Sequence, residues 1–198
     1  CWGKNNFGQL GLGNSSSNDV LTPHTVTFNG ASTPLSVHAG RNEFCAQLDN
    51  GSAACWGQNA DGQFGLGNTT SQTSPIALTL PTGRTIASMS MAKDFICITL
   101  DNGSVVCAGR NTEFQIGQGT TSAAELSWKY VIGLDMVAHS VELGQDVGCA
   151  HLVNGSMACW GEDVWGLFGN STTSYTLRVA STATQYANFG NGRTAAFI

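Results

Sequence analysis

Short stretches of alternating apolar and polar residues recur along this chain, separated by polar, glycine-rich segments. One stretch runs from Phe44 to Leu48, meets the triplet Asp49-Asn50-Gly51, and resumes from Ser52 to Cys55. Two short strands joined by Asp-Asn-Gly are typical of a β-hairpin whose loop is a type I turn followed by a left-handed glycine. The register that this loop predicts places Leu48 opposite Ser52, Gln47 opposite Ala53, Ala46 opposite Ala54 and Cys45 opposite Cys55.

The hairpin pattern returns at 97–107 and 149–159, and a glycine-rich motif recurs beside it. The motif is clearest at 55–68, opens the chain at 1–14, and returns in eroded form from Cys107 and from Cys159. The cysteines that begin the four copies of the motif are 54, 52 and 52 residues apart. A repeat of this length predicts one domain built from stacked units. We place the units at 1–54, 55–106, 107–158 and 159–198, the last one truncated within its hairpin.

Six of the seven cysteines form three local pairs, each with a spacing of ten residues, and Cys1 is left over. Opposed residues on antiparallel strands lie about 4.5 to 5.5 Å apart at Cα, which a disulfide tolerates. We therefore expect three disulfides, Cys45–Cys55, Cys97–Cys107 and Cys149–Cys159, with Cys1 unpaired or paired outside this chain. Free buried thiols and zinc ligands are the alternatives, but the four histidines recur at no common repeat position. Disulfides imply an oxidising compartment, so the expected location is extracellular or on the cell surface.

Composition narrows the fold class and the partners. The 198 residues are 41% hydrophobic and only 11% charged, and they include 25 glycines, which favours a turn-rich all-β protein. A net charge of -5 gives no reason to expect a nucleic-acid partner. We expect no membrane span, because no apolar run approaches the roughly 20 residues that a spanning helix needs. The glycine motif lacks the strand-to-helix context of a nucleotide loop, so we expect no cofactor.

The run Trp2-Gly3-x-Asn5-x-x-Gly8-Gln9-Leu10-Gly11-x-Gly13, completed by the hairpin and Trp56-Gly57, resembles the regulator of chromosome condensation repeat. The resemblance implies a β-propeller of four-stranded antiparallel blades, about four in this chain. The ring would be incomplete or closed with a neighbouring copy. The third unit departs from the motif, because Ala108 replaces the tryptophan and Phe114 replaces a glycine. We expect local repacking there.

The two ends of the chain are complementary halves of one hairpin. Residues 192–198 resemble 40–46, with Phe197 in the position of a cysteine, while Cys1 begins the outgoing strand. We expect head-to-tail self-association through the terminal strands into a larger chain, ring or filament. The alternatives are closure within one chain and a segment cut from a longer repeat protein.

Two sets of residues are candidates for surface functions. Asparagines followed by x-Ser/Thr predict N-glycans in a eukaryotic secretory host, at Asn14, Asn68 and Asn170. Aromatic residues outside the repeated positions are possible anchors for a protein partner: Trp128, Tyr130, Trp165, Tyr175 and Tyr186. For these aromatics, packing between blades is the alternative.

The sequence favours a function without catalysis. The paired cysteines are expected to form disulfides, and the carboxylates are sparse and scattered along the chain. We therefore predict no catalytic residue and no metal site. The first hypothesis is an extracellular structural or assembly module. A secreted protein-binding module, inhibitor-like or receptor-like, that uses the blade-face loops is the second. An enzyme with an active site in the propeller channel is the third.

Overall fold

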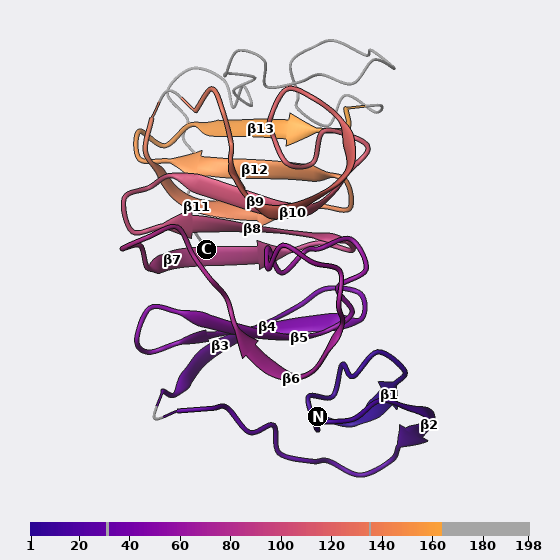
Figure 1. Ribbon diagram of the computed structural model, residues 1–198. Coiled ribbons are helices and arrows are strands. Elements are labelled where there is room, and N and C mark those ends of the chain that lie inside the picture. The colour runs from indigo at the N-terminus through magenta and orange to yellow at the C-terminus, as the bar shows by residue number, and fades with distance from the viewer. Residues whose placement is uncertain (31, 135, 164–198) are drawn as a thin grey trace.

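The computed structural model describes residues 1–163 except Ala31 and Asp135. This part of the chain has thirteen strands in four antiparallel sheets and contains no helix, which confirms the all-β fold class. The sheets follow one another in chain order, from the first strands at the bottom of Figure 1 to the last described strand at the top. The ring is not closed by these sheets.

Each sheet is a meander in which successive strands pair. The first sheet pairs β1 (Gly3–Asn5) with β2 (Ser16–Val20). The next is β3 (Pro34–Ala39), β4 (Glu43–Leu48), β5 (Ala53–Gly57) and β6 (Gln72–Ala77), which we call blade 1. Blade 2 contains β7 (Ile86–Met91), β8 (Phe95–Leu100), β9 (Val105–Asn111) and β10 (Ser122–Tyr130). Blade 3 has β11 (Ala138–Leu143), β12 (Val147–Leu152) and β13 (Met157–Gly161).

The predicted hairpin register is confirmed in blade 1. Cys45 pairs with Cys55, Ala46 with Ala54 and Gln47 with Ala53, and the Leu48 amide donates to the Ser52 carbonyl at 2.8 Å. Gly51 has a φ of 77°, the left-handed conformation that the three-residue loop requires. The turn chemistry therefore fixes which cysteines meet.

All three disulfides are present in the structure. They join Cys45 to Cys55, Cys97 to Cys107 and Cys149 to Cys159, with Cα–Cα distances of 4.0, 4.1 and 4.1 Å. Each bridge crosses the hairpin of the two middle strands of its blade, where the cysteine side chains are buried or nearly so.

The blades pack face to face through apolar side chains. One buried cluster joins blades 1 and 2 and includes Cys45, Phe64 and Ile96, while a second joins blades 2 and 3 and includes Cys107 and Val141. Removal of these faces from water supplies the main stabilising free energy. A single blade could not bury its own faces, so the units depend on their neighbours.

Serine side chains also link blade 2 to blade 3 at the innermost strands. The backbone amides of Val141 and Leu143 on β11 donate to the hydroxyls of Ser88 and Ser90 on β7, at 3.4 and 3.1 Å. These amides lie on the free edge of β11, because β12 pairs with the other edge. The serines therefore satisfy backbone donors that a sheet edge would leave open.

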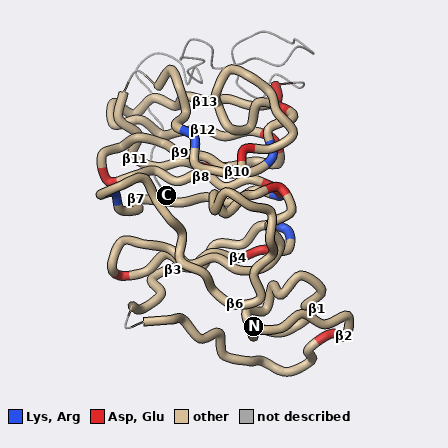
Figure 2. Tube along the Cα trace, in the orientation of Figure 1, with Lys and Arg blue, Asp and Glu red and all other residues tan. Residues whose placement is uncertain are grey.

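Charge is confined mainly to the strand ends and the loops between them (Figure 2). Acidic and basic residues are mixed there: Asp94 forms ion pairs with Lys93 at 3.5 Å and with Arg110 at 3.7 Å. Glu162 lies near Asp146 and Glu113, and slight burial together with these like charges raises its pKa. The described residues include no helix that is long and apolar enough to span a membrane.

Candidate protein-interaction site

Each of the first three sequence units contributes a loop that packs against the following blade, and we call these loops, residues 5–13, 59–67 and 111–119, the motif loops. A buried asparagine is the first residue of each motif loop, and its side chain holds the loop in shape through hydrogen bonds to the loop backbone. Asn59 Oδ1 accepts from the Phe64 amide at 3.0 Å, and its Nδ2 donates to the Asn68 carbonyl at 3.0 Å. Asn5 and Asn111 make the equivalent bonds. The loop shape is therefore the same in each unit.

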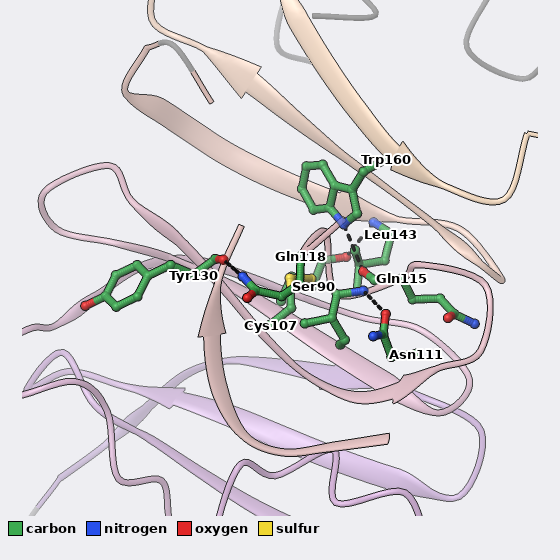
Figure 3. The surroundings of a disulfide bond; sticks show 10 residues. Ser90, Cys107, Asn111, Gln115, Gln118, Tyr130, Leu143 and Trp160 are labelled. Carbon is green, nitrogen blue, oxygen red and sulfur yellow. Dashed lines mark hydrogen bonds between the residues drawn. A yellow bond between two sulfur atoms is a disulfide. The ribbon is translucent and has the colours of Figure 1, made fainter. Parts of the chain in front are cut away.

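A tryptophan from the next unit docks on the loop. Trp56 Nε1 donates to the Gln9 carbonyl at 2.9 Å, and Trp160 Nε1 donates to the Gln115 carbonyl at 2.8 Å, as Figure 3 shows for the second pair. Both tryptophans are only 1% exposed. A Cβ atom at Gly11 would lie 3.1 Å from the Trp56 ring, so a glycine lets the ring approach. We call this arrangement the tryptophan dock.

The dock between the second and third units is built differently, and the expected repacking is found there. Ala108 stands at the tryptophan position, and Trp128 on β10 covers the loop instead, with ring atoms 2.5 Å from a Cβ built at Gly65. Trp128 Nε1 is buried and has no hydrogen-bond partner among the described residues. Trp128 thus replaces the volume of the missing ring but not its hydrogen bond. Phe114 has a φ of 62°, a left-handed conformation that glycine adopts in the other units.

Trp2 occupies the dock position of the first unit, yet it is 66% exposed. Beside it, Cys1 is a free cysteine, although the cysteine at this position in each described blade is bridged. The edge of β1 opposite β2 has no partner strand among the described residues. Sequence reasoning singled out Cys1 but did not single out Trp2 as a candidate site residue.

The remaining candidates fall into three groups. Trp128 is partly buried in the blade 1–blade 2 cluster, which is the packing alternative, whereas Tyr130 is 48% exposed and points away from the disulfide in Figure 3. Asn14 and Asn68 lie on exposed loops. Residues outside the described part of the chain are Trp165, Tyr175, Tyr186 and the sequon at Asn170.

A carboxyl group that the sequence analysis missed is buried between blades 1 and 2. Glu43 is 1% exposed, at the position where the other blades have Phe95 and Val147. Its Oε2 accepts from the Asn42 amide at 2.8 Å, whereas no direct hydrogen bond to its buried Oε1 is found among the described residues, and the nearby Gln63 side chain gives only a pKa-lowering interaction. Burial raises the pKa of this carboxyl to about 7, against the backbone hydrogen bonds that lower it. A charged residue at an otherwise apolar repeat position was the available signal.

Three polar residues one repeat apart lie on the innermost strands, where a channel active site would form. Ser90 Oγ lies 3.4 Å from Glu142 Oε2, whereas His38 Nε2 is bonded to Ser36 Oγ at 3.0 Å. The Ser90 hydroxyl therefore lies beside a carboxylate, and the imidazole of His38 pairs with the neighbouring Ser36 and not with Ser90. Within the described residues, no group of three or more His, Cys, Asp or Glu side chains is arranged to hold a metal ion.

Comparisons with known proteins agree with this architecture. The family model of the regulator of chromosome condensation (RCC1) repeat matches residues 1–46 and 50–98. The secretion-regulating guanine nucleotide exchange factor of Bos taurus is 32% identical over 118 residues, which are 59% of this chain and 25% of that protein. The chain thus spans about a quarter of that relative's length.

Solved structures share the fold at low identity. Human WBSCR16 superposes with a TM-score of 0.69 at 20% identity, over 78% of this chain and 40% of that one. Prp20p of Saccharomyces cerevisiae, the yeast RCC1, gives a TM-score of 0.65 at 20% identity, over 76% of this chain and 37% of that one. The repeated motif loops and the family match show that the chain carries RCC1 repeats over residues 1–46 and 50–98, and its four-strand meanders share the β-propeller fold of the solved structures.

Proposed function

We propose that this chain is a non-enzymatic extracellular assembly module that joins another repeat of its own kind through the surface around Cys1 and Trp2. The observation that carries the proposal is the exposure of Trp2, since its counterparts Trp56 and Trp160 are buried in tryptophan docks. The partner would supply a motif loop, and repeated contacts would give a larger chain, ring or filament.

The internal docks define what would cover Trp2. The docks of Trp56 and Trp160 each offer a glutamine carbonyl that accepts from the indole and a glycine that admits the ring. Burial of a large aromatic side chain is worth about 2–3 kcal/mol, and the exposed edge of β1 can add backbone hydrogen bonds. A head-to-tail contact of this kind uses different surfaces on the two partners, so it propagates unless the geometry closes a ring.

The disulfides support the proposed compartment. Three bridges in a chain of 198 residues are unusual for a protein of the reducing cytosol. The exposed Asn14 and Asn68 are compatible with N-glycans in that compartment. One relative is named an exchange factor, but the same bridges weigh against a cytosolic exchange role for this chain.

Association of the purified protein tests the proposal. Light scattering after size exclusion, under non-reducing conditions, should show species whose mass rises with concentration. Trp2→Ala should weaken the association at least about tenfold, equal to 1.4 kcal/mol. Leu21→Ala is the matched control, because Leu21 is 85% exposed and near the same end of the chain but has no dock role. A monomer at every concentration, with wild type and Trp2→Ala alike, would refute the proposal.

A second candidate function is a secreted protein-binding module that uses the blade-face loops. It is favoured by Tyr130, which is 48% exposed at the end of β10. Such a module would need a binding surface on the loops at the ends of the blades, made of residues that are not required for folding.

A further inference from the structure

We propose that β3, the first strand of blade 1, is a docking surface for the two inner strands of a blade supplied by a second copy of this chain. The proposal rests on the proposed association with another repeat, but it concerns a surface other than Trp2. Its apolar positions are Pro34, Val37 and Ala39, which are all exposed, and we call them the β3 face.

The repeats provide an internal control for the β3 face. Val37, Met89 and Val141 occupy the same register position on the first strands of the three blades. Val37 is 60% exposed, whereas Met89 is 4% and Val141 only 1% exposed. Pro34 is exposed as well, while its equivalents in the next two blades are buried: Ile86 and Ala138. The fold therefore uses these positions for contacts between blades, and in blade 1 they are open to solvent.

The covered positions show what kind of surface fits there. Met89 lies in a buried cluster with the Cys45–Cys55 bridge, and Val141 lies in one with the Cys97–Cys107 bridge. In both contacts the cover is the middle hairpin of the preceding blade. A surface that continues these interfaces by one repeat would therefore present the middle hairpin of a blade to Val37.

The sheet β1–β2 lies beside blade 1 at the bottom of Figure 1 and supplies the outer half of such a blade. Its first residues, Cys1-Trp2-Gly3, align with Cys55-Trp56-Gly57, so β1 is equivalent to β5, the third strand of blade 1. Within the described part of the chain only β2 pairs with β1, so the other edge of β1 is open. A strand added to that edge would take the place of a second strand and would lie over the β3 face, as β4 lies over Met89.

The sequence of the chain points to a second copy as the occupant. Residues 192–198 resemble 40–46, the segment that leads into β4 of blade 1. Residues 192–198 lie outside the described part of the chain, but every copy carries this sequence. The two copies would use different surfaces, so the contact propagates unless it closes a ring. Closure by the chain's own segment is the alternative that the test must separate.

Two substitutions on the same strand test the β3 face. Val37→Glu places a charge where an apolar contact is expected, so it should weaken the concentration-dependent association at least about tenfold. Leu35→Glu is the matched control and should associate as wild type does. Leu35 is 67% exposed, and its equivalents Ala87 and His139 are exposed even though the strands that carry them are covered by a preceding blade. Light scattering after size exclusion, under non-reducing conditions, measures both variants.

Amide exchange gives a second measurement at the surface itself. Residues 34–39 should exchange more slowly in the assembled wild type than at dilutions where the protein is monomeric, and Val37→Glu should remove this difference. Val37→Glu should also keep the thermal unfolding curve of the dilute wild type, because the side chain is exposed in the monomer. If that curve changes, Val37→Ser replaces the variant and should weaken the association in the same direction.

The outcomes separate this inference from the contact through Trp2. Association that Trp2→Ala weakens but Val37→Glu leaves unchanged would overturn the β3 face and keep the proposed function. Association that Val37→Glu weakens and Trp2→Ala does not would support the β3 face and count against the Trp2 contact. Equal weakening by Val37→Glu and Leu35→Glu would overturn the inference. So would a monomer at every concentration, whether residues 34–39 are protected by the chain's own segment or exchange freely.

Discussion

Single residues in this protein carry information when they differ from their counterparts one repeat away. Glu43 replaces Phe95 and Val147 at a buried position, and Phe114 keeps a left-handed φ of 62° where other units use glycine. Each substitution costs free energy locally, since a buried carboxylate loses hydration and a non-glycine residue is strained at positive φ. The surrounding blades supply the stability that allows both.

The buried carboxyl predicts a pH-dependent stability. Burial raises the pKa of Glu43 from its ordinary value of 4.5 to about 7 in the folded protein, so the folded state binds the proton more tightly than the unfolded chain. The free energy of unfolding should therefore fall as the pH rises from about 4.5 to 7, by up to about 3 kcal/mol from this group. Urea unfolding at pH 5 and pH 8 measures it.

Glu43→Gln should remove most of that pH dependence and stabilise the protein at pH 8. Asp19→Asn is the control for the loss of one acidic side chain, because Asp19 is exposed on β2, outside the contact between blades 1 and 2. A wild-type protein that is equally stable at both pH values would contradict the assignment.

At the scale of elements, each motif loop and the tryptophan that packs on it connect two units. The strand that supplies the tryptophan differs between docks. The tryptophan comes from β5 in one dock and from β13 in another, but from β10 in the middle one, where the indole makes no hydrogen bond. Ring volume and hydrogen bonding are therefore separable contributions to the same contact.

The same substitution should give different results in different docks. Trp160→Phe removes the bond to the Gln115 carbonyl and leaves a buried acceptor, which costs about 1–3 kcal/mol beyond the loss of ring volume. Trp128→Phe removes no hydrogen bond, so it should be less destabilising by roughly that amount. Chemical unfolding of both variants gives the comparison, and equal losses would argue against the separation.

Much of this element structure could be predicted from the sequence. The Asp-Asn-Gly loop set the register, and the register set the disulfides, because turn chemistry and strand pairing are local. Position 108 lacks the tryptophan, and its replacement by Trp128 could not be predicted. The two positions are twenty residues apart and come together only through the irregular pairing of β9 with β10.

At the scale of the whole molecule, blades and sequence units are offset. The last strand of blade 1, β6, comes from the unit 55–106, and the last strand of blade 2, β10, comes from the unit 107–158, so each of these units completes the blade begun by the one before it. Stability should therefore be shared between neighbours, as in other repeat proteins whose units cannot bury their own faces.

Loss of the central bridge tests this sharing. Removing Cys97–Cys107 with paired alanine substitutions should cost about 3 kcal/mol, the value expected for a loop of this length. Because blade 2 packs on both neighbours, amide exchange should rise in blades 1 and 3 as well as in blade 2. Exchange that rises in blade 2 alone would indicate that the blades unfold independently.

The relocated ring at Trp128 has a consequence for how such proteins are recognised. The family match ends at residue 98, just ahead of the unit that lacks the tryptophan and a glycine, yet that unit still completes a four-stranded blade. A unit can therefore form a complete blade even where its sequence no longer matches the motif. A count of blades that relies on signature residues will therefore miss blades in which a side chain from another repeat position replaces the signature residue.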